Sequence, residues 1–111
     1  MKTLYGVQLG NYLRINQTNE IRKVIGLTKK KIGINDGGGN TRYYYLPDIS
    51  GIPLTLEILE KYKEVMEDYK KIGDEVFFII PEGSSNLYTV RWFHELQNVL
   101  ELHNHRIQWI D

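Results

Sequence analysis

The sequence contains no cysteine and no long apolar run. Without cysteine the chain forms no disulfide bond and offers no thiolate for catalysis or metal binding, and such a chain fits the reducing cytoplasm best. The first residues, MKTLYGVQLGNYLRI, have no apolar run like that of a secretory signal peptide, and no later stretch has the length of a membrane span. We therefore expect a cytoplasmic protein that does not bind a membrane.

The sequence also lacks the residue patterns of an enzyme site. Its serines lie in no recognisable nucleophile elbow, so hydrolase chemistry is not expected. The histidines His94, His103 and His105 do not have the three- or four-residue spacing that places two metal ligands on one helix face. We expect no enzymatic activity, no metal site and no cofactor.

Length and composition indicate one globular domain, residues 1–111, with 41% hydrophobic and 25% charged residues. The formal net charge is zero, but the charges are unevenly distributed. Residues 1–45 carry eight Lys/Arg and two Asp/Glu, whereas residues 46–111 carry six Lys/Arg and twelve Asp/Glu. This asymmetry has three interpretations: an anionic partner for the basic half, two halves of opposite charge that face each other, or simply one long acidic helix.

Short segments rich in β-branched and aromatic residues fill the first half of the chain, with polar or glycine turns between them. They predict a small antiparallel meander that curls into an SH3-like half barrel. Gly26 and Gly33 lie inside two of these segments, where glycine is typical of a bulge or a sharp bend. The predicted strands are Asn11–Ile15, Glu20–Leu27, Lys30–Asn35 and Thr41–Leu46.

The second half of the chain changes to a helical period. Gly51–Asp74 is predicted to be one long helix, with Thr55 as its cap and Gly73 as its stop. A buried strand at Glu75–Pro81 and a second helix at Val90–Asn104 follow, and RIQWID is predicted to close the chain as a short strand. The expected fold is therefore α+β: a small antiparallel sheet or SH3-like half barrel packed on one long helix and a second C-terminal helix. The predicted core residues are Leu59, Tyr62, Met66, Phe77, Ile79, Phe93, Leu96 and Leu100.

The segment INDGGGNTRYYYLP, residues 34–47, is the most unusual in the chain. Three glycines can expose consecutive backbone N–H groups to an anion, and on a strand Tyr43 and Tyr45 share one face while Tyr44 takes the other. Two interpretations stay open: a flexible hairpin whose tyrosines pack on the long helix, or a contact loop that works with the basic residues of the neighbouring turn and strand. The candidate ligand-binding residues are Arg22, Lys29, Lys30, Lys31, Gly37, Gly38, Gly39, Arg42, Tyr43 and Tyr45.

Three segments resemble a family of small uncharacterised proteins that is common in Bacteroidetes genomes and their phages. The segments are LGNYLRI, IPLTLEILEKY and FHELQN, and the last two match the family pattern at Leu54, Thr55, Ile58, Leu59, Lys61, His94, Leu96, Gln97 and Asn98. The chain departs from the family after Lys61, where it continues as YKEVMEDYKKIG, and at its end, HNHRIQWI. The resemblance implies an α+β fold and an origin in a phage or mobile element, and it implies no known activity.

These observations favour a non-enzymatic binding protein, with two kinds of partner. One is a nucleotide-type anion, such as an immune signal that a phage or mobile-element counter-defence protein would sequester. The other is a host protein, inhibited through contacts with exposed aromatic residues. Neutral net charge and the lack of a known DNA or RNA motif argue against a nucleic-acid partner, and a homo-oligomer is left open.

Overall fold

The computed structural model describes residues 6–35 and 37–110, and it has an α+β architecture with two antiparallel sheets. The chain divides into two compact units, Met1–Ile52 and Pro53–Asp111. The sequence shows no boundary at Ile52, because no linker-like composition marks it. That the two units fold as one domain stays a prediction.

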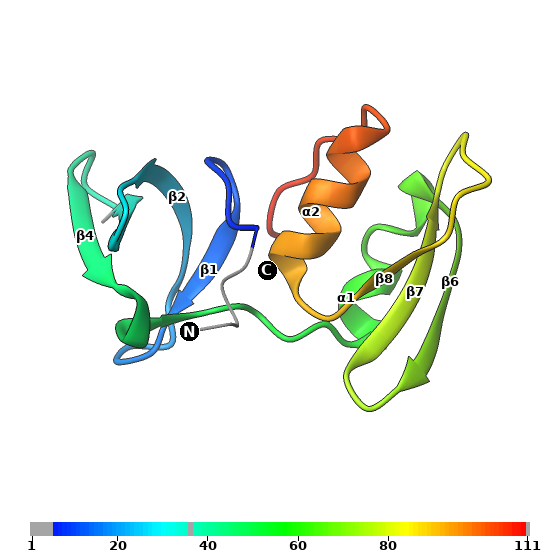
Figure 1. Ribbon diagram of the computed structural model, residues 1–111, viewed down its shortest axis with the longest axis horizontal. Helices are drawn as coiled ribbons and strands as arrows, with labels where there is room; N and C mark the ends of the chain where they lie inside the picture. The colour runs from blue at the N-terminus through cyan, green and yellow to red at the C-terminus, as the bar shows by residue number, and fades with distance from the viewer. Residues whose placement is uncertain (1–5, 36, 111) are drawn as a thin grey trace. The chain divides into compact units, whose positions relative to one another are not determined.

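The first unit is a five-stranded sheet in the order β4-β3-β2-β1-β5. The sheet curls, so that β4 and β1 lie on opposite sides of the core (Figure 1). A 3-10 turn at Leu46–Asp48 leads from β4 into β5, which pairs with β1. The strands are β1 (Tyr12–Ile15), β2 (Ile21–Leu27), β3 (Lys31–Asn35), β4 (Thr41–Tyr45) and β5 (Ile49–Ser50).

The four predicted strands of the first half are confirmed, each to within a residue of its predicted ends. Alternate residues turn their side chains to opposite faces of the sheet, so the apolar positions of each strand meet inside the curl. A bulge interrupts the pairing of β2 with β3 between Val24 and Gly26, which confirms the prediction for Gly26. The core of this unit is aliphatic and consists of Leu13, Ile15, Val24, Ile32, Ile34 and Ile49.

The second unit combines a three-stranded sheet, in the order β6-β7-β8, with two helices. The central strand β7 alternates half-buried and buried residues along its whole length. The helix α2 packs next to β8 (Figure 1). The elements are α1 (Leu56–Glu60), a 3-10 turn (Lys63–Val65), β6 (Met66–Gly73), β7 (Val76–Pro81), β8 (Tyr88–Val90) and α2 (Phe93–Leu102).

The predicted long helix Gly51–Asp74 is wrong. Helix α1 begins where predicted, because the Thr55 side chain accepts a hydrogen bond of 3.1 Å from the Ile58 N–H, but it ends at Glu60. The following segment forms β6 instead, antiparallel to β7, with two irregularities in its register. Since the core strand β7 needs a hydrogen-bonding neighbour on each side, sheet pairing overrides the helical spacing of this segment.

Helix α2 confirms the second predicted helix, with shorter ends. The Glu95 carboxylate accepts hydrogen bonds from the backbone N–H groups of Arg91 (2.7 Å) and Trp92 (3.2 Å), which fixes the start of the helix. The predicted closing strand is wrong, because residues 105–110 belong to no helix or strand. Side chains hold this tail: the Tyr62 hydroxyl donates to the Gln108 carbonyl (2.6 Å) and accepts from the Ile110 N–H (2.9 Å).

All eight predicted core residues are buried. Met66 is buried as the first residue of β6 and not as part of a helix, so this prediction holds for a reason other than the one that motivated it. Over residues 6–35 and 37–110, no helix is both long enough and apolar enough to cross a membrane.

Candidate functional site

A pocket of about 320 Å³ lies beside the β3–β4 turn of the first unit. Tyr12 and Lys23 are cross-strand partners on β1 and β2, so their side chains share the face opposite the buried Leu13 and Val24. Arg22 pairs with Leu13 and projects to the other face, so the pocket is lined by residues from both faces of β2 and by the glycine turn. Its walls are formed by Tyr12, Ile21, Arg22, Lys23, Asn35, Gly37 and Gly39.

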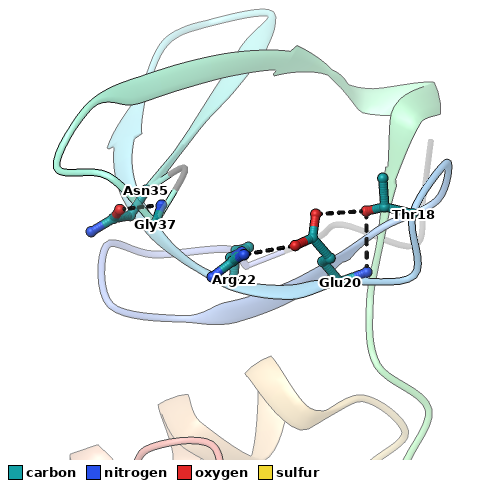
Figure 2. A network of polar contacts seen from close by, with 5 residues as sticks. All are labelled: Thr18, Glu20, Arg22, Asn35 and Gly37. Atoms are coloured by element: carbon teal, nitrogen blue, oxygen red, sulfur yellow. Dashed lines mark hydrogen bonds and ion pairs between the residues drawn. The ribbon is translucent and has the colours of Figure 1, made fainter.

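The turn is shaped by glycine and by the side chain of Asn35. Gly37 and Gly39 have φ of 92° and 87°, which L side chains rarely adopt. The Gly37 N–H donates a 2.8 Å hydrogen bond to the Asn35 Oδ1, as in an Asx turn (Figure 2). This bond occupies the Gly37 N–H, so Gly37 does not contribute to the predicted anion nest in this conformation.

The Arg22 guanidinium lies against the same turn. A side chain at position 37 would begin 3.4 Å from the Arg22 Nη1, so glycine leaves this guanidinium nitrogen open toward the pocket. The other terminal nitrogen, Nη2, forms an ion pair of 2.6 Å with Glu20 (Figure 2). Arg22 is therefore held in place on one side and faces the glycine turn on the other.

Glu20 is held ionised by its neighbours. Its carboxylate accepts hydrogen bonds from Arg22 and from the Thr18 hydroxyl (3.0 Å), and these bonds, followed by the charge of Arg22, lower the pKa of Glu20 below its ordinary value. Since the folded-state pKa is depressed, the contact is fully formed above the ordinary glutamate pKa and is lost as the pH falls through the lowered value. At neutral pH Glu20 is thus an internal anion that competes for Arg22.

Two predicted site residues, Tyr43 and Tyr45, lie on the face of the sheet that points away from the core. A Cβ built on Gly33 would lie 2.9 Å from the Tyr43 ring, and one on Gly26 would lie 2.9 Å from the Tyr43 hydroxyl. The ring of Tyr43 therefore lies across both glycines, on top of the sheet. The neighbouring Tyr45 has the Lys31 ammonium 4.9 Å from its ring centre.

The predicted alternation of the three tyrosines is confirmed. Tyr43 and Tyr45 are 49% and 55% exposed, whereas Tyr44 packs against the aliphatic core. Arg42 lies on the same side of the strand as Tyr44, and its guanidinium is 5.8 Å from the Tyr44 ring centre. Arg42 is not among the residues that line the pocket.

The structure brings only part of the predicted site together. Arg22, Gly37 and Gly39 meet at the pocket, and Gly38 lies between the two glycines of the same turn. The predicted convergence of the basic residues on one edge is wrong. Lys29–Lys31 lie at the turn between β2 and β3, whereas Arg22 lies at the opposite end of β2. Lys31 pairs with Tyr45 at one end of β3, and Asn35 pairs with Thr41 at the other, about 13 Å away at ~3.3 Å per residue. Lys29 and Lys30 lie in the turn before Lys31.

Four of the seven pocket residues are not among the predicted site residues, namely Tyr12, Ile21, Lys23 and Asn35. An Asn two positions before a glycine is a signal for an Asx turn, so Asn35 could have been found. Tyr12 and Lys23 come together through the β1–β2 register, which the sequence does not determine.

The histidines of the second unit have structural contacts. The His103 Nε2 lies 2.8 Å from the Tyr88 hydroxyl, and the His105 Nε2 lies 3.0 Å from the Glu82 carbonyl oxygen. His94 is fully buried in α2. Across the part of the chain that the structure describes, no group of three or more His, Asp or Glu side chains is arranged to hold a metal ion.

Comparisons of the chain with known protein families, with curated proteins and with solved structures find no match. The resemblance to the Bacteroidetes and phage family therefore stays a prediction.

Proposed function

We propose that the first unit binds a nucleotide-type anion without catalysing a reaction, at the pocket beside the glycine turn. The observation that carries the proposal is the position of the Arg22 guanidinium against a turn in which Gly37 has no side chain to cover it. A charge-assisted hydrogen bond from arginine to a phosphate is among the stronger polar contacts in proteins.

The surroundings of Arg22 support this choice of ligand. Lys23 adds a second positive charge, Tyr12 offers a ring on which a base can stack, and Asn35 offers amide donors and acceptors. The first unit as a whole carries eight Lys/Arg and three Asp/Glu, a formal charge of +5. A field of this sign attracts anions to the unit.

Replacing Arg22 with alanine is expected to weaken the binding of a nucleotide about 10- to 150-fold, because a hydrogen bond to a charged group contributes about 1.5–3 kcal/mol. The measurement is calorimetric titration of the parent and Arg22→Ala with a panel of linear and cyclic nucleotides at two salt concentrations. Arg106→Ala is the matched control, since Arg106 is 80% exposed and forms a comparable ion pair with Glu101 (2.9 Å) in the second unit. If the parent binds no member of the panel at micromolar concentration, the proposal fails.

Glu20→Gln is expected to have the opposite effect. The substitution removes the internal carboxylate that competes for Arg22, so nucleotides should bind more tightly and the dependence on salt should persist. A parallel loss of affinity in Glu20→Gln would show that Glu20 is needed to position Arg22.

Arg42→Ala, in contrast, should change affinity little, because Arg42 lies on the edge strand and does not line the pocket.

A second candidate function is binding of a host protein. Among the described strands, β4 pairs only with β3, and the five residue pairs between them are in regular register. A regular, unprotected edge strand can add a strand from a partner, and the half-exposed Tyr43 and Tyr45 would flank it. The aromatic residues of the second unit contribute less to this candidate, because Trp109 lies edge-on against the buried Phe93 at 5.1 Å. Loss of partner capture in Tyr45→Ala, with nucleotide affinity unchanged, would favour this candidate.

Two finer proposals accompany the function. The strand order of the first unit, its bulge at Gly26 and its 3-10 turn before β5 support an SH3-like half barrel. The resemblance to proteins of phages and mobile elements supports a counter-defence role, in which the protein would sequester a signalling nucleotide.

A further inference from the structure

We infer that the ligand of the first unit is a single-stranded oligonucleotide, held along the outer face of β2, β3 and β4 and not only in the pocket. This inference rests on the proposed function and specifies its ligand class. It also revises the expectation that nucleic acid is not a partner, because that expectation used the net charge of the whole chain and not the +5 of this unit.

The outer face carries a row of side chains that leads from the lysine turn to the pocket. Antiparallel partners project to the same side of a sheet, so three cross-strand pairs lie in sequence along β3 and β4. The row ends at Asn35, which is also a wall of the pocket. The pairs are Lys31 with Tyr45, Gly33 with Tyr43, and Asn35 with Thr41.

Tyr43 is placed as a stacking surface. Gly33 pairs with Gly26 across the strands, and two facing glycines weaken a sheet unless something covers them. The Cε2, Cζ and hydroxyl atoms of Tyr43 cover the two glycines, while about half of the side chain stays exposed. A ring fixed in this way can stack a base without first losing rotamer freedom.

The two basic groups of the unit lie at opposite ends of this row. Lys31 pairs with Tyr45 and follows Lys29 and Lys30 of the turn, whereas Lys23 on the outer face and Arg22 on the other face of β2 line the pocket. The two ends of β3 are about 13 Å apart, whereas stacked rings lie about 4.5–7 Å apart. One base therefore cannot stack on Tyr45 and also reach the pocket, so a single nucleotide would use only part of the face. A strand of several nucleotides would place phosphates at both basic ends and bases on the tyrosines between them.

The test is a length series of unstructured probes measured by calorimetry: thymidine monophosphate, then oligothymidylates from the dinucleotide to the octanucleotide. The affinity is expected to rise with length and to fall with salt, with a shallower salt dependence in Lys31→Ala. Oligouridylates measured in parallel distinguish RNA from DNA as the source of the ligand. A duplex of the same length should bind more weakly, because its bases are not accessible for stacking.

Tyrosine variants separate stacking from folding. Tyr43→Leu and Tyr45→Leu keep an apolar side chain on the strand but lose the ring, and each should lower octanucleotide affinity about 5- to 150-fold while leaving mononucleotide affinity unchanged. Tyr43→Phe and Tyr45→Phe should bind like the parent, and so should Tyr69→Leu, a control in the second unit.

The outcomes distinguish this inference from the proposed function. Affinity that does not change with probe length, or leucine variants that bind the octanucleotide like the parent, would overturn the inference and leave the mononucleotide pocket intact. An octanucleotide that fails to bind while the mononucleotide binds would do the same, and would leave the tyrosine face to the protein partner. If no probe of any length binds, both the inference and the proposed function fail.

Discussion

Leu96→Ala is expected to lower the free energy of unfolding by about 2–5 kcal/mol, because it leaves a cavity in a closely packed core. Leu96 is fully buried in α2 and belongs to the core of the second unit. The measurement is chemical denaturation followed by circular dichroism. Leu102→Ala in the same helix is the matched control, since Leu102 is 73% exposed and should change stability by no more than about 0.5 kcal/mol.

The same experiment tests whether the chain behaves as one domain. If the two units unfold together, Leu96→Ala shifts a single transition that all probes report. If they unfold separately, only the transition of the second unit shifts, and the signal of the first unit keeps its midpoint. Equal stability of Leu96→Ala and the parent would contradict the placement of α2 against a packed core.

Much of the fold could be predicted from local patterns. The strands of the first unit are short, β-branched and separated by polar turns, and each of these signals acts within a few residues. Helix α2 was found because Phe93, Leu96 and Leu100 recur at helical spacing and are all buried. The strand β7 was found because an apolar run ends at Pro81.

The segment after Glu60 could not be assigned in this way. Tyr62, Met66 and Tyr69 fit a helical period, yet Met66 and Tyr69 belong to β6. What makes this segment a strand is non-local, because β7 needs hydrogen-bonding partners and β6 is one of them. The two strands are joined by a turn in which Glu75 has a φ of 58°. A left-handed glutamate is uncommon, and the preceding Gly73-Asp74 fits a helix stop as well as a hairpin turn, so the local pattern does not distinguish the two.

The candidate site shows the same limit. The glycine turn was conspicuous in the sequence, and its contact with Arg22 was among the predicted combinations. Lys29–Lys31 are near Arg22 in the sequence but lie at the opposite end of β2, so the predicted single edge does not form. In a hairpin the two ends of a strand point to opposite turns, so the register decides which basic residues meet.

Gly33→Val is expected to destabilise the first unit by an amount at the upper end of the ~1–3 kcal/mol range for overpacking. A Cβ at this position would lie 2.9 Å from both the Thr41 Cγ2 and the Tyr43 ring, and 3.2 Å from the Gly26 Cα. The two side chains can move, but the Gly26 backbone is held by its pairing with β3. Gly73→Ala in β6 is the matched control, because its nearest neighbour would be at 3.9 Å and little should change.

A double-mutant cycle shows how much of this cost arises from the Tyr43 ring. Tyr43→Leu should be less destabilising in the Gly33→Val background than alone, since a smaller side chain leaves room for the new methyl groups, and the coupling should be about 0.5–3 kcal/mol. Denaturation midpoints of the four proteins give this coupling energy. Independent effects of the two substitutions would contradict a ring that rests on Gly33. The stacking surface proposed for oligonucleotides would then lose its support, because Tyr43 would not be fixed against the sheet.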